Sequence, residues 1–165
     1  MQTKDIVNKL SLSSYAVGLG GCKVHKTTLD CCEYNITIFD DSTQKNEIKT
    51  VENDIVQIHH GKINETNQDI LQKYENMEVL SDPKWELRTL LANLKEKQQK
   101  IRHSVAKNCL VDAAFFATKA KQNLDDQFAA IWIKCSAYLI CDGLVLLNSK
   151  QRSPTHMLEF IRKFE

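Results

Sequence analysis

The sequence contains no C-x-x-C pair, although it has six cysteines. Cysteines at that spacing are the usual ligands of a structural zinc ion, so the zinc-ribbon signature is absent. Three cysteines lie among apolar residues at helical spacing, where a reduced cysteine behaves as a small hydrophobic side chain; they are Cys109, Cys135 and Cys141. Cys31 and Cys32 are adjacent, and a redox or metal role for this pair is kept as an alternative.

The sequence also lacks an excess of charge and a long apolar run. Its 22 Lys and Arg residues against 21 Asp and Glu residues give a net charge of +1, which exerts no overall pull toward nucleic acid or anionic lipid. The longest apolar stretch, 139–147, is interrupted by Asp142 and Gly143 and is shorter than the ~20 residues that cross a bilayer. We expect a cytoplasmic protein with no membrane partner, and binding to nucleic acid is left open.

Glycine and proline are scarce, and their positions divide the chain. Four of the five glycines and most β-branched runs lie before residue 82, whereas Pro83 and Pro154 punctuate a second half with helical periodicity. We therefore expect an α+β protein with two domains. A small mixed sheet with flanking helices occupies residues 1–82, and a helical bundle occupies residues 83–165.

The first half predicts short elements. Residues 3–12 have the apolar spacing of a helix, and alternation or β-branched content predicts three strands near 15–21, 34–40 and 48–59, followed by a helix after residue 66 and a short strand at 77–80.

The second half predicts four helices. Asp82 and Pro83 are suited to begin the first of them, and the helices are expected at 84–103, 104–122, 125–147 and 154–164. The second and third are apolar around most of their circumference, which is typical of helices buried on several sides. We expect a homodimer or another protein partner to cover them.

One ordered set of residues resembles a known family. The first strand ends in Gly20-Gly21, the second begins at Glu33-Tyr34-Asn35, and Asp54 lies on the next strand. This order resembles the polymerase-beta-type nucleotidyltransferase superfamily, particularly its minimal and kanamycin-nucleotidyltransferase-like branches. That family has Gly-Ser after its first strand, Asp-x-Asp on the second and a third carboxylate on the next. Glu78–Pro83 and the later apolar helices also resemble its strand, helix start and C-terminal bundle.

The resemblance implies a site for a nucleotide and magnesium. Glu33, Asn35 and Asp54 would occupy the catalytic positions, and Glu33 and Asp54 would be the remaining metal ligands. Two carboxylates at i and i+2 on a strand face the same side, and Mg²⁺ prefers such oxygen ligands. The turn would hold phosphates through four further residues; they are Gly20, Gly21, Lys23 and Lys26.

The sequence departs from the family at the residues that carry charge. Gly21 replaces the serine hydroxyl, Glu33 has a longer side chain than aspartate, and Asn35 has no charge. We therefore predict a catalytically degenerate protein that binds a nucleotide or a partner, with no certain cofactor. An active transferase that uses Mg²⁺ is the alternative, and an antitoxin-like or scaffold role through the helices is a second alternative.

Overall fold

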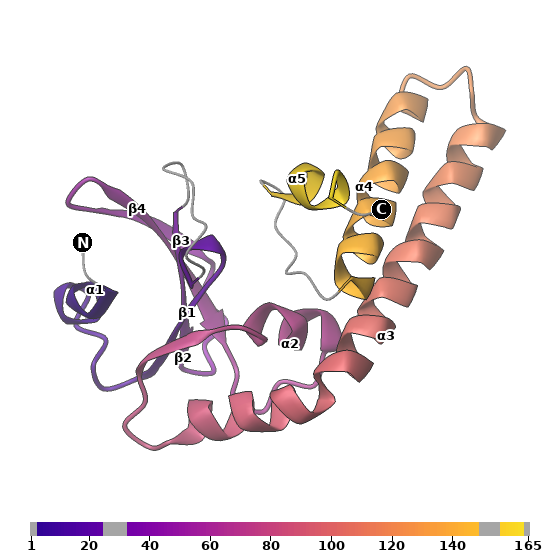
Figure 1. Ribbon diagram of the computed structural model, residues 1–165. Helices are drawn as coiled ribbons and strands as arrows, with labels where there is room; N and C mark the ends of the chain where they lie inside the picture. The colour runs from indigo at the N-terminus through magenta and orange to yellow at the C-terminus, as the bar shows by residue number, and fades with distance from the viewer. Residues whose placement is uncertain (1–2, 25–32, 149–155, 164–165) are drawn as a thin grey trace. The chain divides into compact units, whose positions relative to one another are not determined.

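The computed structural model describes residues 3–24, 33–148 and 156–163, and it confirms the predicted α+β class (Figure 1). The strands are β1 (Ala16–Gly20), β2 (Tyr34–Phe39), β3 (Glu47–Val51), β4 (Asp54–Gly61) and β5 (Glu78–Ser81). The helices are α1 (Thr3–Lys9), α2 (Gln68–Tyr74), α3 (Glu86–Gln122), α4 (Ala129–Leu147) and α5 (Met157–Ile161), with a 3₁₀ turn η1 (Cys22–Val24). The chain divides into two compact units, 1–97 and 98–165, and the point of division along the sequence lies inside α3. The composition of the sequence had predicted a boundary after Asp82.

The five strands form one sheet in the order β3-β4-β2-β1-β5. Neighbouring strands are antiparallel except β2 and β4, which are parallel. In the antiparallel β1–β2 pair, Gly20 lies opposite Asn35. The end of the first strand is therefore beside the beginning of the second.

One face of the sheet carries the core of the first unit. Alternate residues of the three central strands point to this face and pack with Ile6 and Val7 of α1. They are Val17, Leu19, Ile36, Ile38, Val56 and Ile58, each at most 6% exposed. Burial of each such side chain contributes about 1.5–3 kcal/mol, so this apolar set also fixes which residues face the other way.

The opposite face is covered by α2 and the residues that follow it. A Cβ on Gly18 would lie 2.1 Å from the Met77 sulfur, and a Cβ on Gly61 would lie 2.7 Å from the Tyr74 hydroxyl. The rings of Phe39 and Tyr74 meet edge to face, with centroids 5.1 Å apart. Burial, with a smaller contribution from the charge of Glu65, raises the pKa of Tyr74 to about 12, so its phenol is neutral at physiological pH.

Two predicted element boundaries were wrong. The single strand expected over 48–59 is a hairpin of β3 and β4, whose turn places Glu52 at a φ of 57°. The helices expected at 84–103 and 104–122 are one helix of 37 residues. Neither glycine nor proline occurs within α3, so nothing in its backbone requires a break.

One helix among the described residues, α4, is long and apolar enough to cross a membrane by length and composition. The apolar stretch 139–147 is the C-terminal part of this helix. Such a helix is also found in the cores of soluble proteins, so this property does not assign a location.

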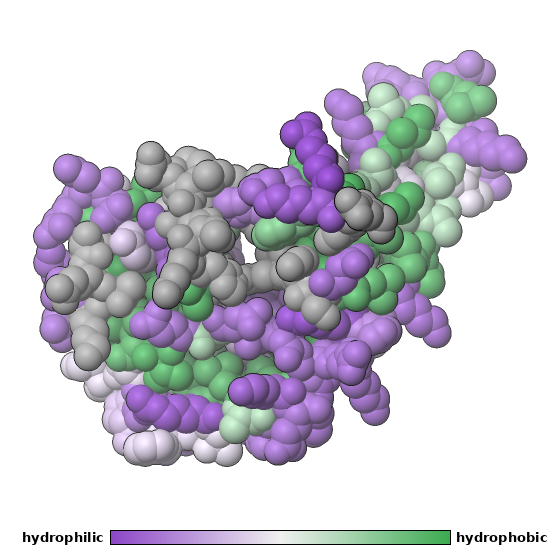
Figure 2. Space-filling model, in the orientation of Figure 1, coloured by the Kyte–Doolittle hydropathy of each residue, from purple (hydrophilic) through white to green (hydrophobic). Residues whose placement is uncertain are grey.

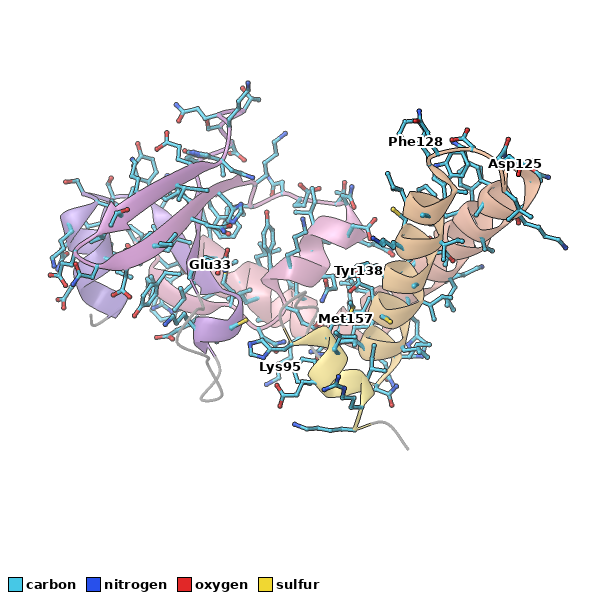
Figure 3. The ribbon with its side chains drawn as sticks, turned by 90° about the horizontal axis from the view of Figure 1, so that it is seen from above. Glu33, Lys95, Asp125, Phe128, Tyr138 and Met157 are labelled. Carbon is cyan, nitrogen blue, oxygen red and sulfur yellow. The ribbon has the colours of Figure 1, made fainter. Side chains whose placement is uncertain are left out.

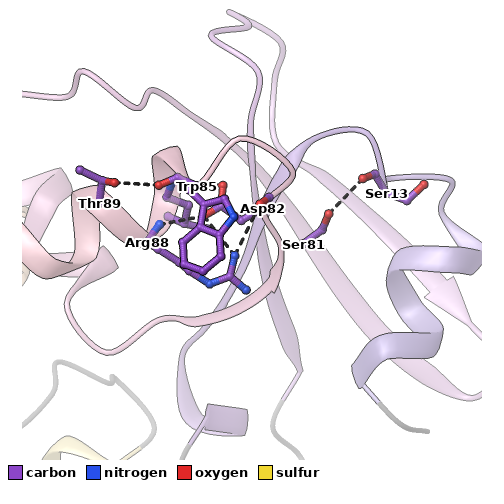
Figure 4. A network of polar contacts seen from close by, with 7 residues as sticks. Ser13, Ser81, Asp82, Trp85, Arg88 and Thr89 are labelled. Carbon is purple, nitrogen blue, oxygen red and sulfur yellow. Dashed lines mark hydrogen bonds and ion pairs between the residues drawn. The ribbon is translucent and has the colours of Figure 1, made fainter.

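Asp82 determines how α3 begins (Figure 4). Its side chain is fully buried and accepts hydrogen bonds from the backbone N–H groups of Leu87 (3.3 Å) and Arg88 (2.9 Å). These are among the first N–H groups of the helix, which have no partner within it. Trp85 precedes the helix at a φ of 62°, and its ring lies 4.8 Å from the Arg88 guanidinium.

We predict that Asp82→Ala lowers the free energy of unfolding by about 1–2 kcal/mol, because two backbone N–H groups lose their acceptor. Urea denaturation followed by circular dichroism measures the change. Asp112→Ala, at an exposed position of the same helix, is the matched control and should change the stability by less than about 0.5 kcal/mol. Equal effects of the two substitutions would contradict the capping role.

Candidate functional site

Polar side chains gather on the α2-covered face of the sheet, where β1 ends and β2 begins. We call Gly21, Glu33, Asn35, Gln57 and His59 the Asn35 cluster. Asn35 lies opposite Gly20 on one side, and it pairs with Gln57 of the parallel strand β4 on the other. Figure 3 shows Glu33 beside the sheet strands. The four side chains are partly exposed, so a ligand can reach them.

Asn35 is the centre of the cluster's hydrogen bonds. Its Nδ2 donates to Glu33 Oε1 at 3.3 Å, and its Oδ1 accepts from His59 Nε2 at 3.5 Å. Since an amide oxygen only accepts, this arrangement places the proton of His59 on Nε2. Gly21 has a φ of 73°, and a Cβ there would lie 2.8 Å from Asn35 Nδ2. The glycine turn therefore packs directly against the asparagine side chain.

His59 has an environment that disfavours its charged form. Burial is the largest cause that lowers the pKa of His59, followed by the positive charge of Lys73 on α2 and by His60. A neutral imidazole can donate and accept hydrogen bonds, so His59 is suited to bind a polar ligand without carrying charge.

Four of the predicted site residues meet at this place. Gly20, Gly21, Glu33 and Asn35 lie together, as their pairing and hydrogen bonds show. The ammonium group of Lys23 lies 5.0 Å from the ring centroid of Tyr34, and the Tyr34 ring belongs to the opposite, core face. Lys26 lies outside the described residues.

The strand register does not bring Asp54 to the cluster. Asp54 is the first residue of β4 and pairs with Val51 across the hairpin. It shares the face of Val56 and Ile58, which are buried in the α1 core. On the face of Asn35, the neighbouring strand instead presents Gln57 and His59.

Sequence reasoning missed Gln57 and His59 as members of the site. The signal was the alternation of Val56-Gln57-Ile58, in which a polar residue lies between two apolar ones. The prediction of a single strand over 48–59 obscures this alternation. That prediction arises because the turn at Glu52 and Asn53 contains no glycine to mark it. With the hairpin recognised, the alternation in β4 would have assigned Gln57 to the face opposite Val56.

The residues of the Asn35 cluster do not fit a magnesium site. Glu33 is its one carboxylate, and Asn35 and Gln57 are neutral amides. Mg²⁺ in nucleotidyl transfer is bound through carboxylates that offset its charge. In the described part of the chain, no three His, Cys, Asp or Glu side chains come close enough together to hold a metal ion.

The adjacent histidines face opposite sides of the sheet, as strand geometry predicts. His60 Nδ1 lies 2.9 Å from Asp40 Oδ2, and Asp40 Oδ1 accepts a hydrogen bond from the backbone N–H of Ser42 at 3.1 Å. His59 instead contacts Asn35. The two imidazoles therefore do not form a chelating pair.

Comparison with protein-family models finds no match for this chain. Comparison with curated proteins also finds none.

We predict that Gly21→Ala destabilises the protein by about 1–2 kcal/mol, because alanine is strained at a positive φ and its Cβ meets Asn35. Gly20→Ala is the matched control, since a Cβ there would have no neighbour nearer than 3.7 Å. Urea denaturation of both variants measures the difference. A Gly21→Ala protein as stable as Gly20→Ala would show that the turn does not require glycine.

The lowered pKa of His59 predicts a pH dependence of stability. The unfolded chain takes up a proton on this residue near pH 6.5, whereas the folded protein does so only at lower pH. The unfolded state therefore binds more protons below about pH 6.5, and the free energy of unfolding should fall as the pH decreases from there. His59→Gln should reduce this slope in denaturation experiments between about pH 7 and 5. His103→Gln, at an exposed histidine of α3, controls for the loss of an imidazole, and an unchanged slope in His59→Gln would refute the assignment.

Proposed function

We propose that this chain is a catalytically degenerate nucleotidyltransferase-like protein, which binds a nucleotide at the Asn35 cluster without transferring a nucleotidyl group. The observation that carries the proposal is the pairing of Asn35 with Gln57 next to the Gly20-Gly21 turn. In the family that the chain resembles, a glycine turn lies beside carboxylates on the neighbouring strands. Beside the glycine turn of this chain, the strands present Glu33, Asn35 and Gln57, and two of these three side chains are amides. The likeness to the superfamily is itself part of the proposal.

The charge at the cluster argues against metal-dependent transfer. A transferase must neutralise a triphosphate and activate a hydroxyl, and metal ions held by carboxylates do this work. A single carboxylate leaves half of the charge of even one Mg²⁺ unbalanced. Glu33 is also engaged by the amide of Asn35, so a metal would have to compete with that hydrogen bond.

The same groups are suited to binding a nucleotide without metal. Asn35 and Gln57 each provide a donor and an acceptor, as the edges of nucleobases do. The ammonium group of Lys73 is near enough to lower the pKa of His59 and supplies positive charge for phosphate oxygens. The backbone at Gly21 carries no side chain that would keep a ligand away.

The alternative role as a scaffold or antitoxin-like protein is favoured by a different observation. Several large apolar side chains of α4 are exposed, among them Ile133, Tyr138 and Ile140. An apolar surface of this kind marks an interaction site. It concerns the second unit and is compatible with nucleotide binding in the first.

We predict that the full chain binds ATP or another ribonucleoside triphosphate with equal affinity in Mg²⁺ and in EDTA, as measured by isothermal titration calorimetry. Asn35→Ala should weaken binding by about 5-fold or more, the loss of one or two hydrogen bonds. Asn123→Ala, at an exposed site on the turn after α3, should leave the affinity unchanged.

Incubation with α-³²P-labelled nucleotides and Mg²⁺ tests the competing activity. We expect no incorporation of label into the protein or added RNA. Magnesium-dependent incorporation that Glu33→Gln abolishes would show an active transferase. Failure of every nucleotide tested to bind in calorimetry would refute the binding role.

A further inference from the structure

The second half of α3 and the whole of α4 form an antiparallel helical hairpin. The Ser136 hydroxyl donates to the Ala113 carbonyl at 2.9 Å, and a Cβ on Gly143 would lie 3.5 Å from the Ala106 carbonyl oxygen. The ammonium group of Lys119 lies 4.7 Å from the Trp132 ring centroid. Figure 3 shows Asp125 and Phe128 at the turn between the two helices. The hairpin belongs to the second unit alone.

The two helices meet along residues at heptad spacing. The contact stripe of α4 runs through Ala129, Trp132, Ser136, Leu139, Gly143 and Leu146, all buried or partly buried. The contact stripe of α3 runs through Ala106, Cys109, Ala113, Phe116 and Ala120, of which four are at most 5% exposed. Alternating steps of three and four residues form the seam of packed helix pairs.

A second stripe with the same spacing begins one residue later on α4. It comprises Ala130, Ile133, Ala137, Ile140, Leu144 and Leu147, and all six are exposed. Ile133 is 55% exposed, and Ile140 and Leu147 are each 43% exposed. We call this set the outer stripe. It extends along the whole helix and carries no charge.

The neighbouring helix presents a matching stripe on the same side. The residues one position after the α3 contact stripe are Lys107, Leu110, Ala114, Ala117 and Lys121, all exposed. Successive residues of a helix are rotated by about 100° around its axis. Seen from one end of the hairpin, this rotation is clockwise in one helix and anticlockwise in the antiparallel neighbour. The residues one position after each contact stripe, on α3 and on α4, therefore lie on the same face of the hairpin. This face is apolar along its centre and has lysines near the ends of its α3 edge. In Figure 2, hydrophobic atoms are exposed along the hairpin among hydrophilic ones.

We propose that this face binds a second copy of the same chain, and that two hairpins form a four-helix bundle with α4 antiparallel to α4 of the other copy. The outer stripe is complementary to itself in this arrangement. Ala130 meets Leu147 of the second copy, Ile133 meets Leu144, and Ala137 meets Ile140. The pairs at the two ends of the interface (Ala130 with Leu147) and at its centre (Ala137 with Ile140) thus each combine a small side chain with a large one, as interlocking helices require.

The area of the face agrees with a stable dimer. The 19 residues of α4 extend about 28 Å, and two adjacent helices are about 20 Å wide. The flat area is on the order of 600 Å², and the relief of the side chains increases the accessible area toward the ~800 Å² per partner of standard interfaces.

A neighbouring apolar stripe and a membrane are less suitable alternatives. The stripe one residue before the α4 contact stripe includes Ile131 and Tyr138, but also Asp142, and its Val145 is already buried. A bilayer would receive Lys134 and Asp142 of α4. It would also receive the charges that α3 carries alongside; these are Lys107, Asp112, Lys119 and Lys121. Charged side chains are costly at the centre of a bilayer.

Sedimentation equilibrium of the full chain tests the proposal over about 1–100 μM, a range that brackets micromolar dissociation constants. The wild-type protein should be a dimer. Ile133→Glu should weaken dimerisation at least about 100-fold, since it buries two uncompensated carboxylates. Ile131→Glu, on the same helix and 52% exposed, should remain a dimer. Circular dichroism establishes that both variants are folded.

The antiparallel arrangement has its own test. Leu144→Lys alone should weaken the dimer. The double variant Ile133→Glu/Leu144→Lys should dimerise at least about 10-fold more tightly than either single variant, because each glutamate then faces a lysine of the other copy. In a parallel pair no such recovery occurs. A monomeric wild-type protein would overturn the proposal, as would disruption by Ile131→Glu but not by Ile133→Glu. Flotation of a monomeric wild-type protein with phosphatidylcholine–phosphatidylglycerol vesicles would assign the face to a membrane instead.

Discussion

The parallel pairing of β2 with β4 decides which side chains share the candidate site. Val56 and Ile58 are buried against α1, and a shift of one residue would move them to the other face of the sheet. Their burial therefore fixes the register, and the register places Gln57 beside Asn35. The same constraint directs Asp54 away from Asn35. The polar cluster is in this sense a consequence of the apolar core behind it.

The two amides of the Asn35 cluster, Asn35 and Gln57, determine what it needs in order to be stable. Three carboxylates in this space would repel one another unless cations bound between them. Here Glu33 accepts from Asn35, and Asn35 accepts from His59, so the hydrogen bonds form a connected chain with one negative charge. Such a chain is satisfied without any ion.

The sequence predicted the elements with strong local signals and failed where tertiary contacts decide. The helix over residues 3–12, the strand beginning at Tyr34 and the capping residue Asp82 were all evident from periodicity and side-chain chemistry. The hairpin turn at Glu52 and Asn53 was not evident from the sequence, because it contains no glycine. Glu52 adopts its positive φ because the strands on both sides of the turn, β3 and β4, pair with each other. The resemblance assigned Asp54 because it carries a carboxylate, and only the paired register shows that it lies on the face opposite Asn35. The predicted division of α3 before Ser104 was also wrong, since Ser104 lies within the helix.

The packing of α4 shows why composition alone did not reveal how the helix is used. Ala129, Ser136 and Gly143 face α3, and their small size permits the backbone approach seen between Ser136 and the Ala113 carbonyl. The larger Ile133, Ile140 and Leu144 lie on the exposed side. A helix that belonged to a complete monomeric core would bury its largest apolar side chains, because burial of each contributes about 1.5–3 kcal/mol. On the side of α4 that faces α3, small residues alternate with Trp132, Leu139 and Leu146, whereas Ile133, Ile140 and Leu144 remain exposed at the spacing of a helical seam. Within the chain α4 packs against α3 and also contacts α5. The exposed stripe is expected of a helix that packs against one more helix, as the proposed pairing with a second copy would provide.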